Sequence, residues 1–114
     1  MDNRETVLEA ARFLDEKKAG NVVVIRVGQQ TTITDYFIIA DSEVQLQLDS
    51  LKSLLLKHLH EKGLVPRNNM REGQSGWVLI DYNDFVVHLF LRETRDFYKL
   101  ETIWGECELV WPRT

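Results

Sequence analysis

Residues 76–98 of the chain read GWVLIDYNDFVVHLFLRETRDFY. Two apolar runs flank Asn83 and Asp84, residue types that tolerate positive φ, and this pattern is typical of a β-hairpin. A turn at these two residues sets how the strands pair, because side chains alternate between the two faces of a sheet. One face is then wholly apolar, with Tyr82 opposite Phe85, Ile80 opposite Val87 and Val78 opposite Leu89. We expect this face to lie in the hydrophobic core.

The other face of the same hairpin is mixed in character. It pairs Trp77 with Phe90, Leu79 with His88, and Asp81 with Val86. Tryptophan and tyrosine often dominate interfaces, because they bury a large area and keep one polar group. This face is therefore a candidate partner-binding surface. The alternative, which the pattern alone leaves open, is that the last helix covers Trp77 and Phe90 as ordinary core.

The rest of the chain alternates between helical and extended patterns. Helical spacing of apolar residues predicts a first helix that ends before Gly20, and a β-branched strand follows over 21–27. Residues 36–40 are apolar on both faces, so we expect the strand over 34–40 to be central in its sheet. The remaining predictions are an edge strand at 65–67, a last helix from Glu93 or Thr94 to Trp104, and a strand or tail over 107–114.

The longest predicted helix begins at a capping box formed by residues 42–45 and runs to about Lys62. Its buried stripe is expected to recur about once per turn: Val44, Leu48, Leu51, Leu55 and Leu59. Together these elements predict an α/β fold in which a mixed β-sheet of about five strands is packed with helices. Residues 1–114 are expected to form a single domain.

Composition narrows the class of protein and of partner. The chain has no run of eighteen apolar residues and no charged-then-apolar amino terminus, so neither a membrane span nor a secretory signal is expected. Cys107 is the only cysteine, which favours a reducing compartment, and the absence of a transit segment favours the bacterial cytoplasm. The net charge is −4. An acidic chain favours a basic protein partner over direct binding of nucleic acid, whose phosphates attract lysine and arginine.

Catalytic and metal-binding patterns are weak. Nucleotidyl transfer needs carboxylates grouped around metal ions, whereas Asp81 and Asp84 are separated and not on one strand face. Asp81 and His88 could form an acid–base pair, but a suitable nucleophile is not evident near them. His58 and His60 are two residues apart on a helix and point in different directions. We therefore predict no enzymatic activity, no cofactor and no metal.

Several blocks resemble the ribosomal silencing factor family, also called the Iojap-related family. They are GWVLIDY at 76–82, VVHLF at 86–90, RDFYKLE at 95–101, IWG at 103–105 and TDYFIIA at 34–40. The blocks occur in the family's order and spacing, together with the long helix, so the resemblance covers nearly the whole chain. One departure is the sequence DSEV at 41–44, where the family has a more polar and basic helix start.

The resemblance implies a nucleotidyltransferase-like arrangement and a function in translation. Members of the family bind the large ribosomal subunit through its ribosomal protein fourteen and sterically block joining of the small subunit, and they form homodimers. The family's motifs place its partner-binding positions here at Trp77, Leu79, Asp81, His88, Phe90, Tyr98 and Glu101. The alternatives are a factor for assembly of the large subunit that uses the same surface, and an enzyme of the nucleotidyltransferase type.

Overall fold

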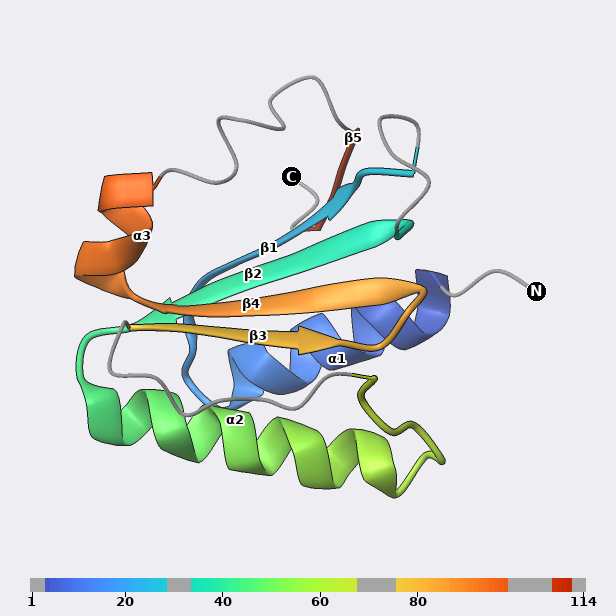
Figure 1. The fold of residues 1–114 in the computed structure, drawn as a ribbon, viewed down its shortest axis with the longest axis horizontal. Coiled ribbons are helices and arrows are strands. Elements are labelled where there is room, and N and C mark those ends of the chain that lie inside the picture. The colour runs from blue at the N-terminus through green and yellow to red at the C-terminus, as the bar shows by residue number, and fades with distance from the viewer. Residues whose placement is uncertain (1–3, 29–33, 68–75, 99–107, 112–114) are drawn as a thin grey trace.

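The computed structural model describes residues 4–28, 34–67, 76–98 and 108–111, of which residues 96–98 are described without their side chains. The elements in chain order are α1 (Arg4–Glu16), β1 (Gly20–Arg26), β2 (Tyr36–Ser42), α2 (Gln45–His60), β3 (Trp77–Asp81), β4 (Phe85–Leu91), α3 (Arg92–Tyr98) and β5 (Glu108–Trp111). The strands form one five-stranded sheet in the order β3-β4-β2-β1-β5 (Figure 1). β2 and β4 are parallel, and the other neighbouring pairs are antiparallel. The predicted mixed sheet is confirmed, whereas the nucleotidyltransferase-like arrangement stays a prediction.

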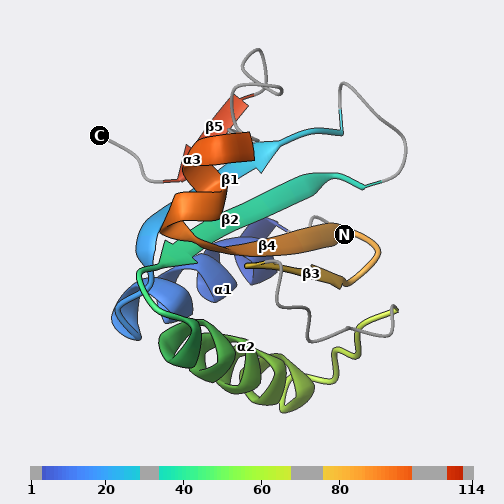
Figure 2. The same ribbon diagram turned by 60° about the vertical axis from the view of Figure 1, so that its left-hand side comes forward.

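Helices α1 and α2 cover one face of the sheet, which we call the inner face (Figures 1 and 2). Side chains of both helices and of the sheet form one apolar cluster, which includes Leu48, Leu51, Leu55 and Leu59 of α2 and Val78, Ile80, Val87 and Leu89 of the hairpin. Burying one such side chain stabilises a fold by about 1.5–3 kcal/mol. The apolar hairpin face is therefore core, as predicted. Helix α3 lies on the opposite, outer face, at the end of the sheet where β3 begins.

The pairing of the hairpin agrees with the sequence pattern. Trp77 is opposite Phe90, Leu79 is opposite His88, and Ile80 is opposite Val87. Asn83 has a φ of 74°, the left-handed conformation that the turn requires. The prediction that 34–40 contains a central strand is also confirmed, because β2 lies between β1 and β4. β5 is the strand expected within 107–114.

The predicted start of the long helix is wrong. α2 begins at Gln45, its N-cap is Val44, and no side chain caps it. Ser42 is the last residue of β2 and its hydroxyl donates to the carbonyl oxygen of Val44 at 3.0 Å, so it does not serve as the cap. Val44 is 57% exposed and does not belong to the buried stripe. Pairing of Ser42 with Leu91 in the sheet extends β2 past the point where local sequence favours a helix cap.

Two further boundaries differ from expectation. Residues 65–67 do not form a strand, although the amide of Arg67 donates to the carbonyl of Asp81 at 2.7 Å. Pro66 has no amide hydrogen to donate to a ladder, which disfavours a strand there. α3 starts at Arg92, directly after β4, and its predicted continuation to Trp104 lies outside the described residues. None of the helices in the described ranges is long and apolar enough to cross a membrane.

Candidate functional site

The mixed hairpin face lies on the outer face of the sheet, and its residues differ in exposure according to their strand. Leu79 on β3 is 41% exposed, and Trp77 and Asp81 on the same strand are half-buried. On β4, His88 is 4% exposed and Phe90 is fully buried. β3 is an edge strand, whereas β4 has β3 on one side and β2 on the other, so β4 is enclosed by neighbours. Of the two strands, β3 therefore has the more accessible side chains on this face.

Phe90 belongs to a second apolar cluster on the outer face. This cluster consists of buried residues packed with three partly buried ones: Ile25, Val27, Ile39 and Phe90, with Val23, Phe37 and Trp77. Phe90 is thus buried, as the core interpretation expects, and Trp77 is half-buried, while the prediction that the last helix covers them stays a prediction. His88 and Phe90 are buried in the free protein, and their assignment to the partner-binding surface stays a prediction. Both contact the Trp77 ring from the neighbouring strand.

Trp77 is held in place by aromatic neighbours. Its indole Nε1–H donates to Nδ1 of His88 at 3.2 Å, and its ring centroid lies 4.9 Å from that of Phe90. Phe37 meets the His88 ring edge-on, with 4.6 Å between centroids. Aromatic pairs at such separations attract through the ring quadrupoles in addition to burying area. Trp77 therefore presents a fixed ring, with its polar group directed into the protein.

The environment of His88 sets its charge. Burial lowers the pKa of His88 from 6.5 to about 4, because a buried imidazolium loses its hydration. The imidazole is therefore neutral near pH 7. Since Nδ1 accepts the bond from Trp77, the proton of the neutral ring is on Nε2.

Asp81 stabilises the turn of the hairpin. Its Oδ1 accepts a hydrogen bond from the amide of Asn83 at 2.8 Å, a pattern in which a carboxylate supports the turn that follows it. Asp81 and His88 make different contacts, to Asn83 and Trp77 respectively. No catalytic pair between them is found in the part of the chain that the structure describes. Within the same ranges, no three His, Cys, Asp or Glu side chains are grouped as a metal ion would require.

Two predicted site residues are not placed. Tyr98 is the last residue of α3, and its side chain is outside the described structure. Glu101 lies in the range 99–107, also outside the described residues. Their roles stay predictions. Gly76, directly before Trp77, is buried, and a Cβ there would meet Thr94 Oγ1 of α3 at 2.5 Å. Helix α3 therefore occupies the space next to Gly76.

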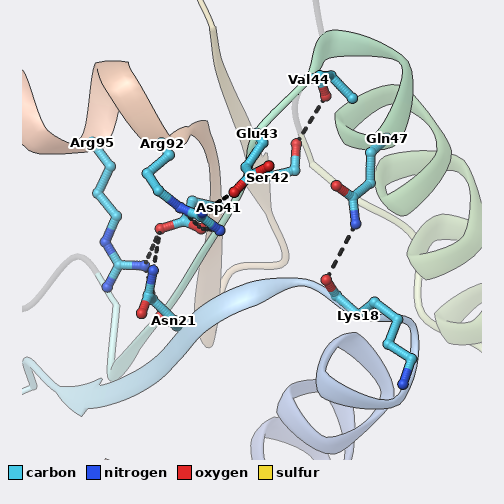
Figure 3. Close-up of polar contacts among 9 residues, drawn as sticks. All are labelled: Lys18, Asn21, Asp41, Ser42, Glu43, Val44, Gln47, Arg92 and Arg95. Atoms are coloured by element: carbon cyan, nitrogen blue, oxygen red, sulfur yellow. Dashed lines mark hydrogen bonds and ion pairs between the residues drawn. The ribbon is translucent and has the colours of Figure 1, made fainter.

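The sequence interpretation missed a polar cluster built around the buried Asp41 and Arg95, which we call the Asp41 cluster (Figure 3). It comprises Asp41, Arg92 and Arg95 together with Asn21 and Glu43. The Asp41 carboxylate accepts from Arg95 Nη1 at 3.1 Å, from Asn21 Nδ2 at 3.0 Å, and from Arg92 Nε and Nη2 at 3.2 and 3.1 Å. These contacts with Asp41 raise the pKa of Arg92, so its guanidinium stays charged.

A weak signal for this cluster was present in the sequence. Asp41 directly follows the apolar strand, and Arg92 and Arg95 are three residues apart, so they face the same side of a helix. The helix itself was predicted to start at Glu93 or Thr94, which placed Arg92 outside it. In the sequence, Asp41 stands out only as part of the departure from the family's pattern at 41–44.

Comparison with known proteins identifies the family. Residues 1–113 match the family described as "Ribosomal silencing factor during starvation". A ribosomal silencing factor of Halalkalibacterium halodurans is 34% identical over 110 residues, which are 96% of this chain and 94% of the relative. The mouse protein named "Mitochondrial assembly of ribosomal large subunit protein 1" is 32% identical over 95 residues, 81% of this chain and 42% of the relative.

Solved structures share the fold. A crystal structure of a Chromobacterium violaceum protein superposes with a TM-score of 0.81 at 26% identity, and covers 92% of this chain and 88% of its own. A crystal structure from Bacillus halodurans gives a TM-score of 0.74 at 33% identity and covers 88% of this chain and 94% of its own. The sequence match extends over nearly the whole chain, and the five-stranded sheet agrees with it. This chain belongs to the ribosomal silencing factor, or Iojap-related, family.

Proposed function

We propose that this protein represses translation by binding the large ribosomal subunit through its ribosomal protein fourteen and sterically blocking the small subunit from joining. The observation that carries the proposal is the family match over residues 1–113. The bound protein acts by occupying a surface, so the mechanism needs neither a cofactor nor turnover. The proposed place of action is the bacterial cytoplasm.

The outer face at β3 supports this proposal. It combines the exposed Leu79, the fixed ring of Trp77 and the carboxylate of Asp81 along one edge of the sheet. Rigid aromatic and aliphatic side chains make strong anchors, because little side-chain entropy is lost on binding. We assign direct contacts to Trp77, Leu79 and Asp81, and expect Tyr98 and Glu101 to extend the same surface.

Charge complementarity supports a basic protein as the partner. The chain has a net charge of −4. An acidic protein is repelled by ribosomal RNA, whereas it attracts a basic ribosomal protein and associates with it faster at low salt. We therefore propose contact with protein rather than with RNA. A homodimer of the free protein is also proposed, and sedimentation equilibrium of the isolated chain would measure it.

A subunit-joining experiment tests the proposal. Purified large and small subunits are mixed with and without the protein, and joined particles are quantified by sedimentation. We expect the wild type to reduce joining in proportion to its occupancy of large subunits. Leu79→Gln should weaken this effect, whereas Leu46→Gln, at an exposed leucine of α2, should not. Unchanged joining at saturating wild-type protein would contradict the proposal.

A second candidate function is assembly of the large subunit with the same surface. It is favoured by the printed name of the mouse relative, which refers to assembly of the mitochondrial large subunit. Under this alternative, cells that lack the protein accumulate immature large-subunit particles, while the added protein leaves joining of mature subunits unchanged. The joining experiment and a profile of particles from such cells therefore separate the two functions.

A further inference from the structure

The Asp41 cluster lies at the joint between α3 and the sheet. We propose that Asp41, acting through Arg95 and Arg92, positions α3 beside Trp77 and thereby sets the geometry of the partner-binding surface. The inference rests on the proposed function. It assigns these three residues a positioning role, distinct from the direct contacts assigned to β3.

α3 depends on tertiary contacts for its position. Most of the stability of a helix in a protein comes from its tertiary packing, because helix formation by itself is marginal in water. The place of α3 on the sheet must therefore come from side chains that bind it to neighbouring elements. Arg92 and Arg95 make such contacts on the side of α3 that faces β1 and β2 (Figure 3).

The central ion pair is almost completely shielded from solvent. Asp41 is 1% exposed and Arg95 is 6% exposed. Arg95 Nη1 also donates to the carbonyl oxygen of Asn21 at 2.6 Å, so one guanidinium ties α3 to both β1 and β2. Because the guanidinium is planar and its donors have fixed directions, two acceptors on two strands define where it lies.

Arg92 adds a second connection from the same helix. Its Nε and Nη2 both donate to Asp41 Oδ1, and its Nη1 donates to Glu43 Oε1 at 2.6 Å. Gly20 makes this approach sterically possible, since a Cβ at that position would clash with the Asp41 carboxylate and with Arg92. Arg92 and Arg95 together hold the first turn of α3 against the ends of β1 and β2.

The other side of α3 touches the start of β3. Gly76 has a φ of +73°, and a Cβ there would lie 2.5 Å from Thr94 Oγ1 and 3.1 Å from Leu91 Cδ1. The amide of Leu91 donates to the carbonyl of Gly76 at 2.8 Å. Gly76 directly precedes Trp77. A shift of α3 would therefore act on the residue adjacent to the proposed anchor.

The chemistry of the pair favours positioning over stability as its main effect. Desolvation of two charges offsets most of their attraction, so apolar replacements of similar volume often leave stability unchanged or raise it. Removing one partner alone is different, because the other charge remains buried and unpaired. A test must therefore remove both charges together. The double variant Asp41→Asn/Arg95→Met does so while it nearly preserves volume.

The experiment measures folding and binding of this double variant. We expect an unfolding temperature within about 5 °C of the wild type, and a Kd for large subunits raised at least about tenfold through lost preorganisation. The matched control is Glu9→Gln/Lys62→Met, which removes a surface ion pair of 2.8 Å between α1 and the end of α2. The control should bind large subunits with wild-type affinity.

A nuclear magnetic resonance readout reports position without the ribosome. In the wild type we expect a nuclear Overhauser contact between Thr94 and the α-protons of Gly76, and the indole N–H of Trp77 marks the site. The double variant should lose this contact and shift the indole resonance, whereas the control should change neither.

The outcomes separate this inference from the proposed function. Failure of the wild type to bind large subunits would remove the proposed function and this inference with it. Wild-type binding by the double variant, or weaker binding with an unchanged Thr94–Gly76 contact, would overturn the inference alone. A double variant that does not fold would assign the cluster to the stability of the fold, and would also overturn it.

Discussion

The indole Nε1–H of Trp77 donates a hydrogen bond to Nδ1 of His88 at 3.2 Å, so the edge strand β3 and the neighbouring strand β4 are joined through side chains on the outer face. The bond fixes the tautomer of His88 and the direction of the Trp77 ring. It also means that Trp77 offers a partner its ring rather than its N–H. This relationship connects the stability of the outer face with its proposed use in binding.

The pKa of His88 predicts how stability depends on pH. The folded-state pKa is about 4, whereas an unfolded histidine titrates near 6.5, so the unfolded state binds more protons between these values. Above pH 6.5, the neutral His88 makes its full contribution to the free energy of unfolding. We expect roughly 3 kcal/mol of it to be lost as pH falls from 6.5 to 4. Urea denaturation at a series of pH values measures the free energy of unfolding.

Two variants identify the residue responsible for that dependence. His88→Gln keeps a side-chain acceptor for Trp77 and removes the titrating group, so its stability should vary less over this pH range. His60→Gln, at an exposed position of α2, controls for loss of an imidazole. A His88→Gln protein with the wild-type pH dependence would contradict the assignment.

Truncation of Trp77 should reduce binding more than folding. Trp77→Ala is expected to cost at least about 2 kcal/mol of binding to large subunits, roughly thirtyfold in Kd. Trp77→Phe keeps a ring but not the internal hydrogen bond, and should retain most of the affinity. Circular dichroism checks that both variants fold.

Trp111 provides the matched control for Trp77. It is a half-buried tryptophan on the opposite edge strand, β5, and it packs against the inner core cluster. Trp111→Ala should lower the unfolding temperature and leave affinity for large subunits unchanged. Equal losses of affinity for Trp77→Ala and Trp111→Ala would argue against Trp77 as a specific anchor.

The charge of Asp81 should affect the rate of association with a basic partner. Because Asp81 also accepts from the amide of Asn83, Asp81→Lys would alter both charge and turn. Asp81→Asn removes the charge and keeps an acceptor, so the turn should persist while association slows and loses part of its salt dependence. Stopped-flow association with the isolated ribosomal protein would measure both effects.

A comparable acidic residue elsewhere serves as the control. Asp15→Asn removes an exposed charge from α1, on the inner-face side of the molecule. It should slow association less than Asp81→Asn does. Wild-type association by Asp81→Asn at low salt would place this carboxylate outside the contact surface, and Glu101→Lys would then test the remaining acidic position.

Val87 should be essential for folding. It is fully buried in the inner cluster, so Val87→Asp places an unpaired charge in the core and should unfold the protein. Leu79→Gln, on the adjacent strand but exposed, should change the free energy of unfolding little. A soluble Val87→Asp protein with unchanged melting behaviour would mean that the core assignment of this face is wrong.

The hairpin could be predicted from the sequence because the features that define it are close together in the chain. Alternating side chains and a turn at Asn83 determine the pairing of β3 with β4, and these features lie within a few residues of each other. The same holds for the buried stripe of α2 after Val44, where helical spacing alone brings the leucines to one side. The start of α2 was predicted incorrectly because Ser42 belongs to β2, and pairing with β4 overrides a local preference for capping.

The site required information that spans the chain. Whether Phe90 and His88 face a partner or the protein depends on neighbours from distant parts of the chain, such as Ile39, which packs with Phe90, and Phe37, whose ring meets that of His88. Alternation of side chains within the hairpin does not show these neighbours. Alternation places Trp77, Leu79 and Phe90 on the same face of the hairpin, although only Trp77 and Leu79 lie on an edge strand.

The sequence by itself determined the two faces of the hairpin and the buried stripe of α2, because each follows from residues near one another in the chain, and it determined the family through motifs spread over nearly the whole chain. Only the tertiary structure decided that Asp41 is buried against Arg95, since the two are 54 residues apart and neither has a local reason to be shielded from water. A buried charge is tolerated only where an opposite charge and hydrogen-bond donors meet it. The packing of α3 on β1 and β2 brings Arg95 into contact with Asp41.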